Sequence, residues 1–185
     1  MTFPLETERL LLRPIEPADV DAFAPYMADP EIVRFIGGEM LSRDQVVERL
    51  ALWRRRFDTD GFGPLALVRR EDGCVVGRCS LLVWQVPEWE TTTAAEATGP
   101  WELELGWILG REHWGRGYAT EAARAVLTFA LDRVGLDRIV SAHAVGNEAS
   151  ANVMRKIGMH LERETIHPGN GRGVRVYEIT RPAKS

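Results

Sequence analysis

The sequence predicts an α+β fold, in which one mixed, mostly antiparallel seven-stranded sheet is flanked by helices. The apolar pattern alternates between periods of about 2 and 3.6 and gives the order β-α-α-β-β-β-α-β-α-β-β. One β-α-β crossover lies at about residues 101–143, and the other strand connections suit antiparallel pairing. With 185 residues and 45% hydrophobic content, the chain fits a single domain over residues 1–185.

The first half of the chain predicts one edge of the sheet and three helical segments. Residues 8–15 form an apolar strand, and residues 17–27 suit a helix with proline in its first turn. A short helical segment follows at residues 29–35. Ser42 and Gln45 match a capping box, which opens a helix that continues to about Phe57.

The middle of the chain predicts a hairpin, a loop and a crossover. Strands at residues 65–70 and 74–86 flank the Asp-Gly turn at residues 71–73. Residues 87–100 break the pattern with threonines, small residues and glutamates, and we expect a mobile surface loop there. The fourth and fifth strands follow at residues 101–109 and 138–143, with a long helix between them.

The last part predicts a short helix and a final hairpin. Asn147 caps a helix that runs to Lys156, and Gly158 ends it. Residues 159–166 and 174–180 then pair as two strands.

A glycine-containing loop joins the fourth strand to the long helix. Gly115 and Gly117 permit a tight turn, and the helix behind them repeats apolar or small residues from Ala119 to Val134 at helical spacing. Free N–H groups at a helix N-terminus bind anions. The loop fits neither the dinucleotide-binding nor the Walker pattern. A plain strand-to-helix turn is the alternative.

The wider segment from Trp114 to Ala122 resembles the acyl-CoA loop of the GNAT superfamily of N-acetyltransferases. That loop commonly reads Arg/Gln-x-x-Gly-x-Gly/Ala; Gly117 and Ala119 match it, and Trp114 stands at the first position. Tryptophan there is typical of the branch similar to ribosomal-protein N-terminal acetyltransferases. The resemblance covers about residues 8–180 and implies a GNAT-like sheet splayed between strands 4 and 5, with acetyl-CoA as donor co-substrate.

A second segment, from Asn147 to Met159, is similar to the same branch. The resemblance implies that Asn147 binds the pantetheine arm, that Asn152 touches the cofactor, and that Ser150 lies near its sulfur. Many GNAT enzymes carry a tyrosine acid at the position of Met154. Protonation of the leaving thiolate therefore passes to Ser150 or to an ordered water.

Acetyl transfer also requires a neutral amine and a stabilised oxyanion. Glu104 is the candidate base, since an amine near pKa 10 is protonated at pH 7. Glu102 is the second candidate, and a solvated strand carboxylate is the alternative for either. The family implies a backbone N–H of Leu109 or a neighbour for the oxyanion. Arg111 and Arg116 would add charge near the pyrophosphate.

The expected catalytic residues are Glu104 and Ser150. The expected cofactor-binding residues are Ile108, Leu109, Trp114, Gly115, Arg116, Gly117, Tyr118, Ala119, Thr120, Asn147 and Asn152. A non-catalytic acyl-CoA-binding sensor is the second functional class, and retained Glu104 and Asn147 favour the enzyme over it.

The acceptor is expected to be a primary amine, either a protein or peptide N-terminus or a small molecule. Aromatic and acidic residues in the segments expected around it suit a cation. These residues are Tyr26, Phe35, Trp84, Trp89, Trp101, Glu88, Glu90 and Glu96.

Composition excludes other classes. A net charge of −4 disfavours a nucleic-acid partner, and there is neither a membrane-length apolar run nor a signal sequence, so we expect a cytoplasmic monomer or homodimer. Cys74 and Cys79 would lie about 16 Å apart in a strand, too far for a disulfide. The four histidines lack metal-ligand spacing, and we expect no metal.

Overall fold

A computed structural model describes residues 3–36 and 38–181, and it has one open sheet between two layers of helices. Within the described residues the sheet has nine strands in the order β1-β2-β3-β4-β6-β7-β9-β8, with β5 paired to β4. Every pairing is antiparallel except that of β6 with β7. The strands are β1 (Leu5–Glu6), β2 (Leu10–Pro14), β3 (Pro64–Arg69), β4 (Val75–Gln85), β5 (Glu90–Thr92), β6 (Trp101–Leu109), β7 (Arg138–Ala144), β8 (His160–Ile166) and β9 (Gly173–Thr180).

The helices begin and end at residues that explain their limits. The predicted capping box of Ser42 and Gln45 is present, and Gly61 ends that helix in the left-handed conformation, with φ 74°. The helices are a 3-10 turn (Pro17–Asp19), α1 (Val20–Met27), α2 (Pro30–Val33), α3 (Arg43–Asp60), a second 3-10 turn (Arg111–His113), α4 (Tyr118–Thr128), its π-helical extension (Phe129–Val134) and α5 (Glu148–Lys156).

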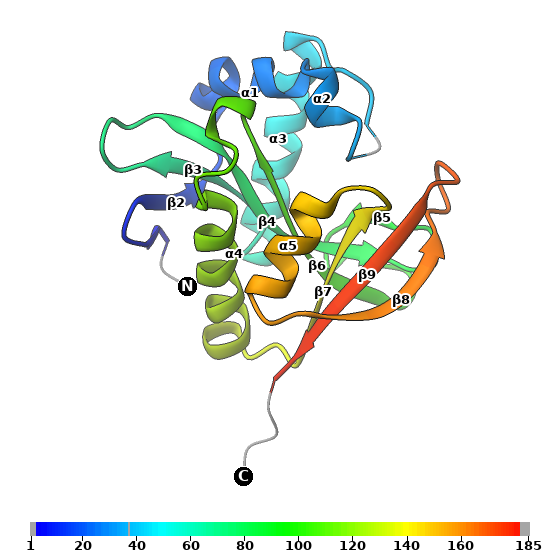
Figure 1. Cartoon of the computed structure of the whole chain (residues 1–185). Coiled ribbons are helices and arrows are strands. Elements are labelled where there is room, and N and C mark those ends of the chain that lie inside the picture. Colours follow the sequence, from blue (N-terminus) through cyan, green and yellow to red (C-terminus); the bar gives the residue numbers. More distant parts are fainter. Residues whose placement is uncertain (1–2, 37, 182–185) are drawn as a thin grey trace.

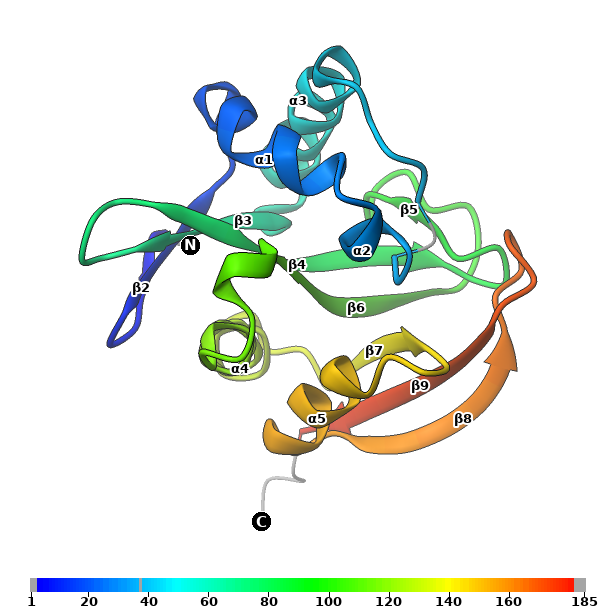
Figure 2. The ribbon, with the colours of Figure 1, turned by 45° about the horizontal axis from the view of Figure 1, so that its top comes forward.

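The two faces of the sheet pack against different helices, as Figure 2 shows: α1, α2 and α3 lie over one face, and α4 and α5 over the other. Strand alternation sends Leu81 and Leu105 into the core with α4. Ile108, on the opposite face of β6, belongs to the core with α1 and α3. Side chains on the same face of β4 and β6 as Ile108 therefore point toward α1–α3.

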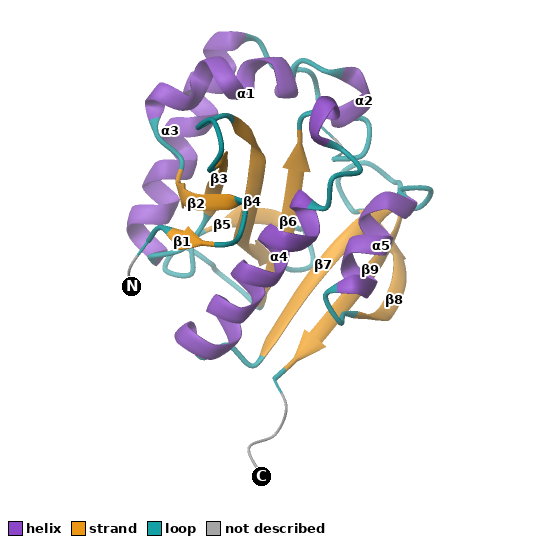
Figure 3. Cartoon of the chain, turned by 60° about the vertical axis from the view of Figure 1, so that its left-hand side comes forward, coloured by secondary structure: helices purple, strands orange, loops and turns teal. Residues whose placement is uncertain are grey.

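The sheet opens between β6 and β7, where Figure 3 shows the two strands diverging. Glu104 of β6 pairs with Val140 of β7, and the parallel ladder has no further register partner in the described chain. Beyond that point the Ser141 hydroxyl donates to the Leu105 carbonyl at 2.6 Å. This side-chain bond satisfies a backbone group that the opening leaves without a strand partner.

The predicted fold class is confirmed, with two additions. All seven expected strands are present, and two short strands, β1 and β5, join them. Strand β5 lies inside the segment 87–100 that the sequence predicts as a mobile loop. Arg56 of α3 donates to Thr91 there, and the Ala94 N–H donates to Asp60. None of the described helices is long and apolar enough to cross a membrane.

Candidate active site

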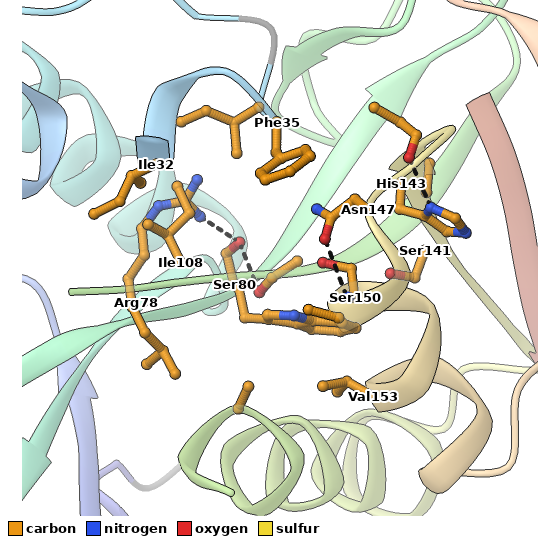
Figure 4. Close-up of a pocket in the computed structure, with 18 of the residues that line it drawn as sticks. Ile32, Phe35, Arg78, Ser80, Ile108, Ser141, His143, Asn147, Ser150 and Val153 are labelled. Atoms are coloured by element: carbon orange, nitrogen blue, oxygen red, sulfur yellow. Dashed lines mark hydrogen bonds between the residues drawn. The ribbon is translucent and has the colours of Figure 1, made fainter. Parts of the chain in front are cut away.

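A cavity of about 690 Å³ runs through the opening in the sheet. Figure 4 shows Arg78, Ser80 and Ile108 on one side, and Ser141, Asn147 and Ser150 on the other. Strands β4 and β6 supply the first side, and β7 and α5 the second. The cavity continues to the loop that precedes α4, so the predicted anion site and the predicted catalytic groups share one space.

The loop before α4 has the backbone conformation that its glycines predict. Gly115 and Gly117 have φ values of 73° and 82°, in the region that strains any residue with a Cβ. Gly117 is the N-cap of α4, so the first N–H groups of this helix face the cavity without a side-chain cap. No heavy atom lies within 4 Å of a Cβ built on Gly115. The loop can therefore accept an anion close to its backbone.

Side-chain contacts on both sides hold this loop in place. The Trp114 indole N–H donates to the Leu109 carbonyl at 2.9 Å and ties the loop to the end of β6. Arg9 donates to the Arg116 carbonyl and forms an ion pair with Glu121 at 2.6 Å. These contacts hold the loop against β6 and α4.

The opening exposes backbone donors of β6. The Leu105 carbonyl points toward β7, because Ser141 reaches it. Backbone groups of alternate residues in a strand point to the same edge, so the N–H groups of Trp107 and Leu109 also face the gap. Both residues line the cavity. They are suitable donors for a developing oxyanion.

Helix α5 contributes its N-terminal turn. The Asn147 side-chain oxygen accepts from the Ser150 N–H at 3.2 Å and caps the helix, which leaves the amide NH₂ group available. Asn152 is exposed, and its side-chain oxygen accepts from Arg155. Asn147, Ser150 and Asn152 all line the cavity.

Glu104 and Glu102 lie on one face of β6, but their surroundings differ. Glu104 is buried and lines the cavity, and its carboxylate accepts no hydrogen bond from the described residues. Burial raises its pKa to about 8, against the opposing effect of Arg78. Glu102 accepts from Arg138 at 2.7 Å and from Arg163 at 2.9 Å, away from the cavity lining.

Arg78 is the main cavity residue that the sequence reasoning missed. It lies on β4, donates to the Ser80 hydroxyl at 2.8 Å, and stacks on Trp53 at 4.8 Å from the ring centroid. Its Nε is buried and has no hydrogen-bond partner in the described chain. An arginine inside an otherwise apolar strand was the available signal. Other cavity residues missed by that reasoning are Arg49, Trp107, Ser141, His167 and Arg172.

The expected acceptor residues are only partly brought together. Phe35, Trp84 and Trp89 line the cavity, and the two indoles stack at 5.1 Å between centroids. Tyr26 is instead buried, with its hydroxyl donating to the Val75 carbonyl.

The expected acids do not meet the acceptor side of the cavity. Its described lining includes Glu39 and Glu104, but it lacks Glu88, Glu90, Glu96 and also Trp101. Glu96 accepts from Thr93 instead. The expectation of acids from the loop after β4 was therefore wrong, because β5 turns that segment toward α3.

Two of the histidines, His113 and His143, and one cysteine, Cys79, are buried. His113 and His143 are buried beside the cavity, and each has one ring nitrogen without a partner in the described chain. Burial raises the pKa of the Cys79 thiol to about 12. The described residues include no cluster of three or more metal-binding side chains.

Most of the residues predicted for the cofactor lie around this one cavity. Arg116 is the exception: it is absent from the described lining, and its carbonyl accepts from Arg9. Arg111 also turns away, with its guanidinium 3.7 Å from Asp29. The predicted residues that line the cavity are Glu104, Ile108, Leu109, Trp114, Gly115, Gly117, Tyr118, Ala119, Thr120, Asn147, Ser150 and Asn152.

Known proteins share this sequence pattern and this fold. Residues 9–160 match the model of the acetyltransferase (GNAT) domain. The uncharacterized protein YkkB of Bacillus subtilis is 32% identical, with 94% of each chain covered. The crystal structure of an acetyltransferase from Agrobacterium tumefaciens has a TM-score of 0.77 and 29% identity over 98% of this chain and 96% of that one.

A third similarity concerns the fold alone. The structure of a putative ribosomal-protein-serine acetyltransferase from Vibrio cholerae has a TM-score of 0.76 at 17% identity, over 98% of this chain and 100% of that one. The family match covers most of the chain, and the relatives extend it to nearly the full length. The chain therefore belongs to the GNAT family and is an N-acetyltransferase.

Proposed function

We propose that this enzyme transfers the acetyl group of acetyl-CoA to a primary amine by direct attack, with Glu104 as the base. The observation that carries the proposal is a buried carboxylate without a hydrogen-bond partner, in the same cavity as the loop before α4 and the opening in the sheet. In this arrangement the donor lies along the loop and α5. The amine approaches from the α1–α3 face.

Donor binding is assigned to backbone groups and to α5. The pyrophosphate would be held by N–H groups between Trp114 and Ala119, where Gly115 and Gly117 keep the backbone accessible. The pantetheine arm would lie in the opening, within reach of the free amide NH₂ of Asn147. This places the thioester next to the backbone donors of Trp107 and Leu109.

The proposed reaction proceeds without a covalent enzyme intermediate. The neutral amine attacks the thioester carbonyl, and its proton passes to Glu104 directly or through water. The N–H groups of Trp107 and Leu109 stabilise the oxyanion. When the tetrahedral intermediate collapses, the C–S bond breaks and the thiolate takes a proton from water, either directly or through the Ser150 hydroxyl, which water reprotonates. Glu104 then releases the amine proton to solvent. The products are the acetylated amine and CoA.

The proposal is tested by titrating acetyl-CoA calorimetrically and then measuring thiol release with small amines and N-terminal peptides. Gly117→Asp should abolish binding, because it adds a Cβ at φ 82° and a negative charge at the anion site. Gly73→Asp, at φ 73° in the remote β3–β4 turn, is the matched control and should bind normally. Normal binding by Gly117→Asp, or no thiol release with any amine, would contradict the proposal.

A further inference from the structure

Arg78 is a charged group without a matching negative partner. It makes no ion pair within the described residues, and its guanidinium donates to the neutral hydroxyl of Ser80. Burial lowers its pKa to about 10, Glu104 opposes that change, and Arg49 adds to it. Arg78 is half-buried, and its buried Nε without a partner is unfavourable unless something binds to it.

The heads of Arg78 and Glu104 converge over Gly106. Ser80 and Gly106 are register partners, and Arg78 reaches the Ser80 hydroxyl, which lies 3.4 Å from the Gly106 carbonyl. A Cβ on Gly106 would lie 2.8 and 2.9 Å from the two carboxylate oxygens of Glu104. The absent side chain therefore leaves room for the Glu104 carboxylate, which forms no ion pair with Arg78.

A second guanidinium extends this positive region. Arg49 of α3 lines the cavity and also makes no ion pair among the described residues. Two neighbouring arginines without carboxylate partners are typical of a site for an anion. In Figure 4 the Arg78 guanidinium lies beside Ser80, and a dashed line marks their hydrogen bond.

We infer that the acceptor is a small amine that also carries a carboxylate, bound with its carboxylate on Arg78 and its amine beside Glu104. This inference rests on the proposed function and specifies its substrate class. An α-amino acid, in which one carbon separates the amine from the carboxylate, would present its carboxylate to Arg78 and its amine to Glu104, both of which line the cavity. The guanidinium plane offers the two parallel donors that a carboxylate accepts.

The remaining wall of the cavity selects the side chain. Phe35 and the stacked pair of Trp84 and Trp89 line it, and the His167 ring packs edge-on against Trp89 at 5.3 Å. These rings favour an apolar or aromatic group. Phenylalanine and leucine are therefore suitable acceptors to test.

The experiment compares each amino acid with its carboxamide as acceptor, using phenylalanine with phenylalaninamide and leucine with leucinamide. The amide's amine is the less basic one and is more often neutral at pH 7, so intrinsic reactivity favours the amide. We expect kcat/KM to favour the acid by about 10-fold or more, the range of a hydrogen-bonded charge pair. Arg78→Gln should bring the ratio close to one, and Arg78→Lys should restore part of it.

Two controls separate recognition from folding and from effects on Glu104. Arg55→Gln removes an exposed arginine of α3 that lies outside the described cavity lining, and it should keep the preference. Each variant should retain acetyl-CoA affinity. If Arg78 acted only through Glu104, Arg78→Gln would slow acid and amide acceptors equally and shift the pH profile, which would overturn the inference.

A binding measurement distinguishes failure of this inference from failure of the proposed function. 3-Phenylpropionate has the carboxylate but no amine, and it should bind the enzyme–CoA complex of the wild type and not that of Arg78→Gln. Transfer to uncharged amines alone, or to peptide N-termini alone, would overturn the inference and leave the acetyl-transfer proposal intact. Arg78-dependent binding without any acetyl transfer would support the carboxylate site and contradict the proposed transfer.

Discussion

The two ends of the cavity are built in different ways. At the donor end, the groups that face the ligand are mainly backbone N–H groups, held by Gly115, Gly117 and the start of α4. At the acceptor end they are side chains, Arg78, Ser80 and Glu104, which lie on one face of the paired strands β4 and β6. One end is defined by local conformation and the other by tertiary contacts.

This difference has a chemical consequence. Backbone donors carry no net charge, so the donor end binds its ligand without titrating. The acceptor end holds a carboxylate and a guanidinium whose pKa values burial moves in opposite directions, to about 8 and about 10. Substitutions at the two ends should therefore separate donor affinity from proton transfer and acceptor choice.

The largest expected effect comes from Glu104→Gln. This change keeps the shape of the side chain and removes the proposed base, so kcat should fall about 10²- to 10⁴-fold. Acetyl-CoA affinity, measured by calorimetry, should change less than about twofold. A comparable loss of donor affinity would show that the two ends are not separate.

The same substitution has a pH signature in activity. Glu104 acts as a base only when ionised, so the wild-type rate should rise with pH up to about 8. The rate of the Glu104→Gln variant should not show this rise. Comparing the two profiles on one acceptor removes the titration of the acceptor amine. Identical profiles would exclude Glu104 as the base.

Glu104 should also affect stability, which should fall with rising pH where activity rises. Its folded-state pKa of about 8 is raised from an ordinary value of 4.5. Between these values the folded protein binds a proton that the unfolded chain does not, so stability falls as pH rises through this range. Glu104→Gln should therefore raise the melting temperature at pH 8 relative to wild type, and less so at pH 5.

The next effect concerns Ser150, at the junction of the two ends. Ser150→Ala should lower kcat by about 10-fold or less, because water can replace the hydroxyl and a thiolate is a tolerable leaving group. The backbone N–H that Asn147 accepts from remains, so α5 stays capped and the melting temperature should not change. A loss as large as that of Glu104→Gln would make Ser150 an essential acid.

A smaller effect is expected at the donor end from a matched pair of glycine substitutions. Gly115 and Gly73 both have φ 73°, and a Cβ on either meets no atom within 4 Å. Alanine at each should cost about 1 kcal/mol of stability through backbone strain. Only Gly115→Ala should also weaken acetyl-CoA binding, by about 5- to 10-fold. Equal binding by both variants would mean that the loop is only a turn.

The same division between the ends decides what the sequence could predict. Gly115, Gly117, the Asn147 cap and the strand order follow from local patterns, since turn chemistry and hydrophobic period are properties of short segments. The sheet opening was expected from family resemblance. Its hydrogen bond from Ser141 to the Leu105 carbonyl joins residues 36 apart in the chain and has no local signal.

At the acceptor end Glu104 and three of the aromatic residues were expected, but the arrangement of Arg78 and Ser80 beside Glu104 was not, because these residues meet only in the folded sheet. The alignment of Ser80 with Gly106 depends on the register of β4 and β6. Glu88, Glu90 and Glu96 have the right charge for an amine, but with β5 paired to β4 and bonded to α3 it is Trp89 and Thr91 of this segment that line the cavity, and the three glutamates do not. The sequence predicted acidic residues from this loop around the acceptor, whereas the cavity wall there includes the arginines Arg78 and Arg49.

The smallest effect on activity is expected from Glu102→Gln, two residues from Glu104 on the same strand. Burial alone would raise the pKa of Glu102, but hydrogen bonds from Arg138 and Arg163 outweigh burial and lower it. It is therefore ionised and bound at neutral pH, and kcat should change less than about twofold. The loss of two charged hydrogen bonds should cost about 1 to 2 kcal/mol of stability, measured by denaturant unfolding at pH 7.

The pH dependence of that loss makes the contrast with Glu104 sharper. Because the folded pKa of Glu102 lies below its ordinary value of 4.5, its contribution is present above that value and disappears as pH falls through the folded pKa. The stability difference between wild type and Glu102→Gln should therefore shrink in acid, whereas that for Glu104→Gln grows in base. If the stability differences for these two variants change with pH in these different ranges, ion pairing is assigned to Glu102 and proton transfer to Glu104. A large drop in kcat for Glu102→Gln would reverse that assignment.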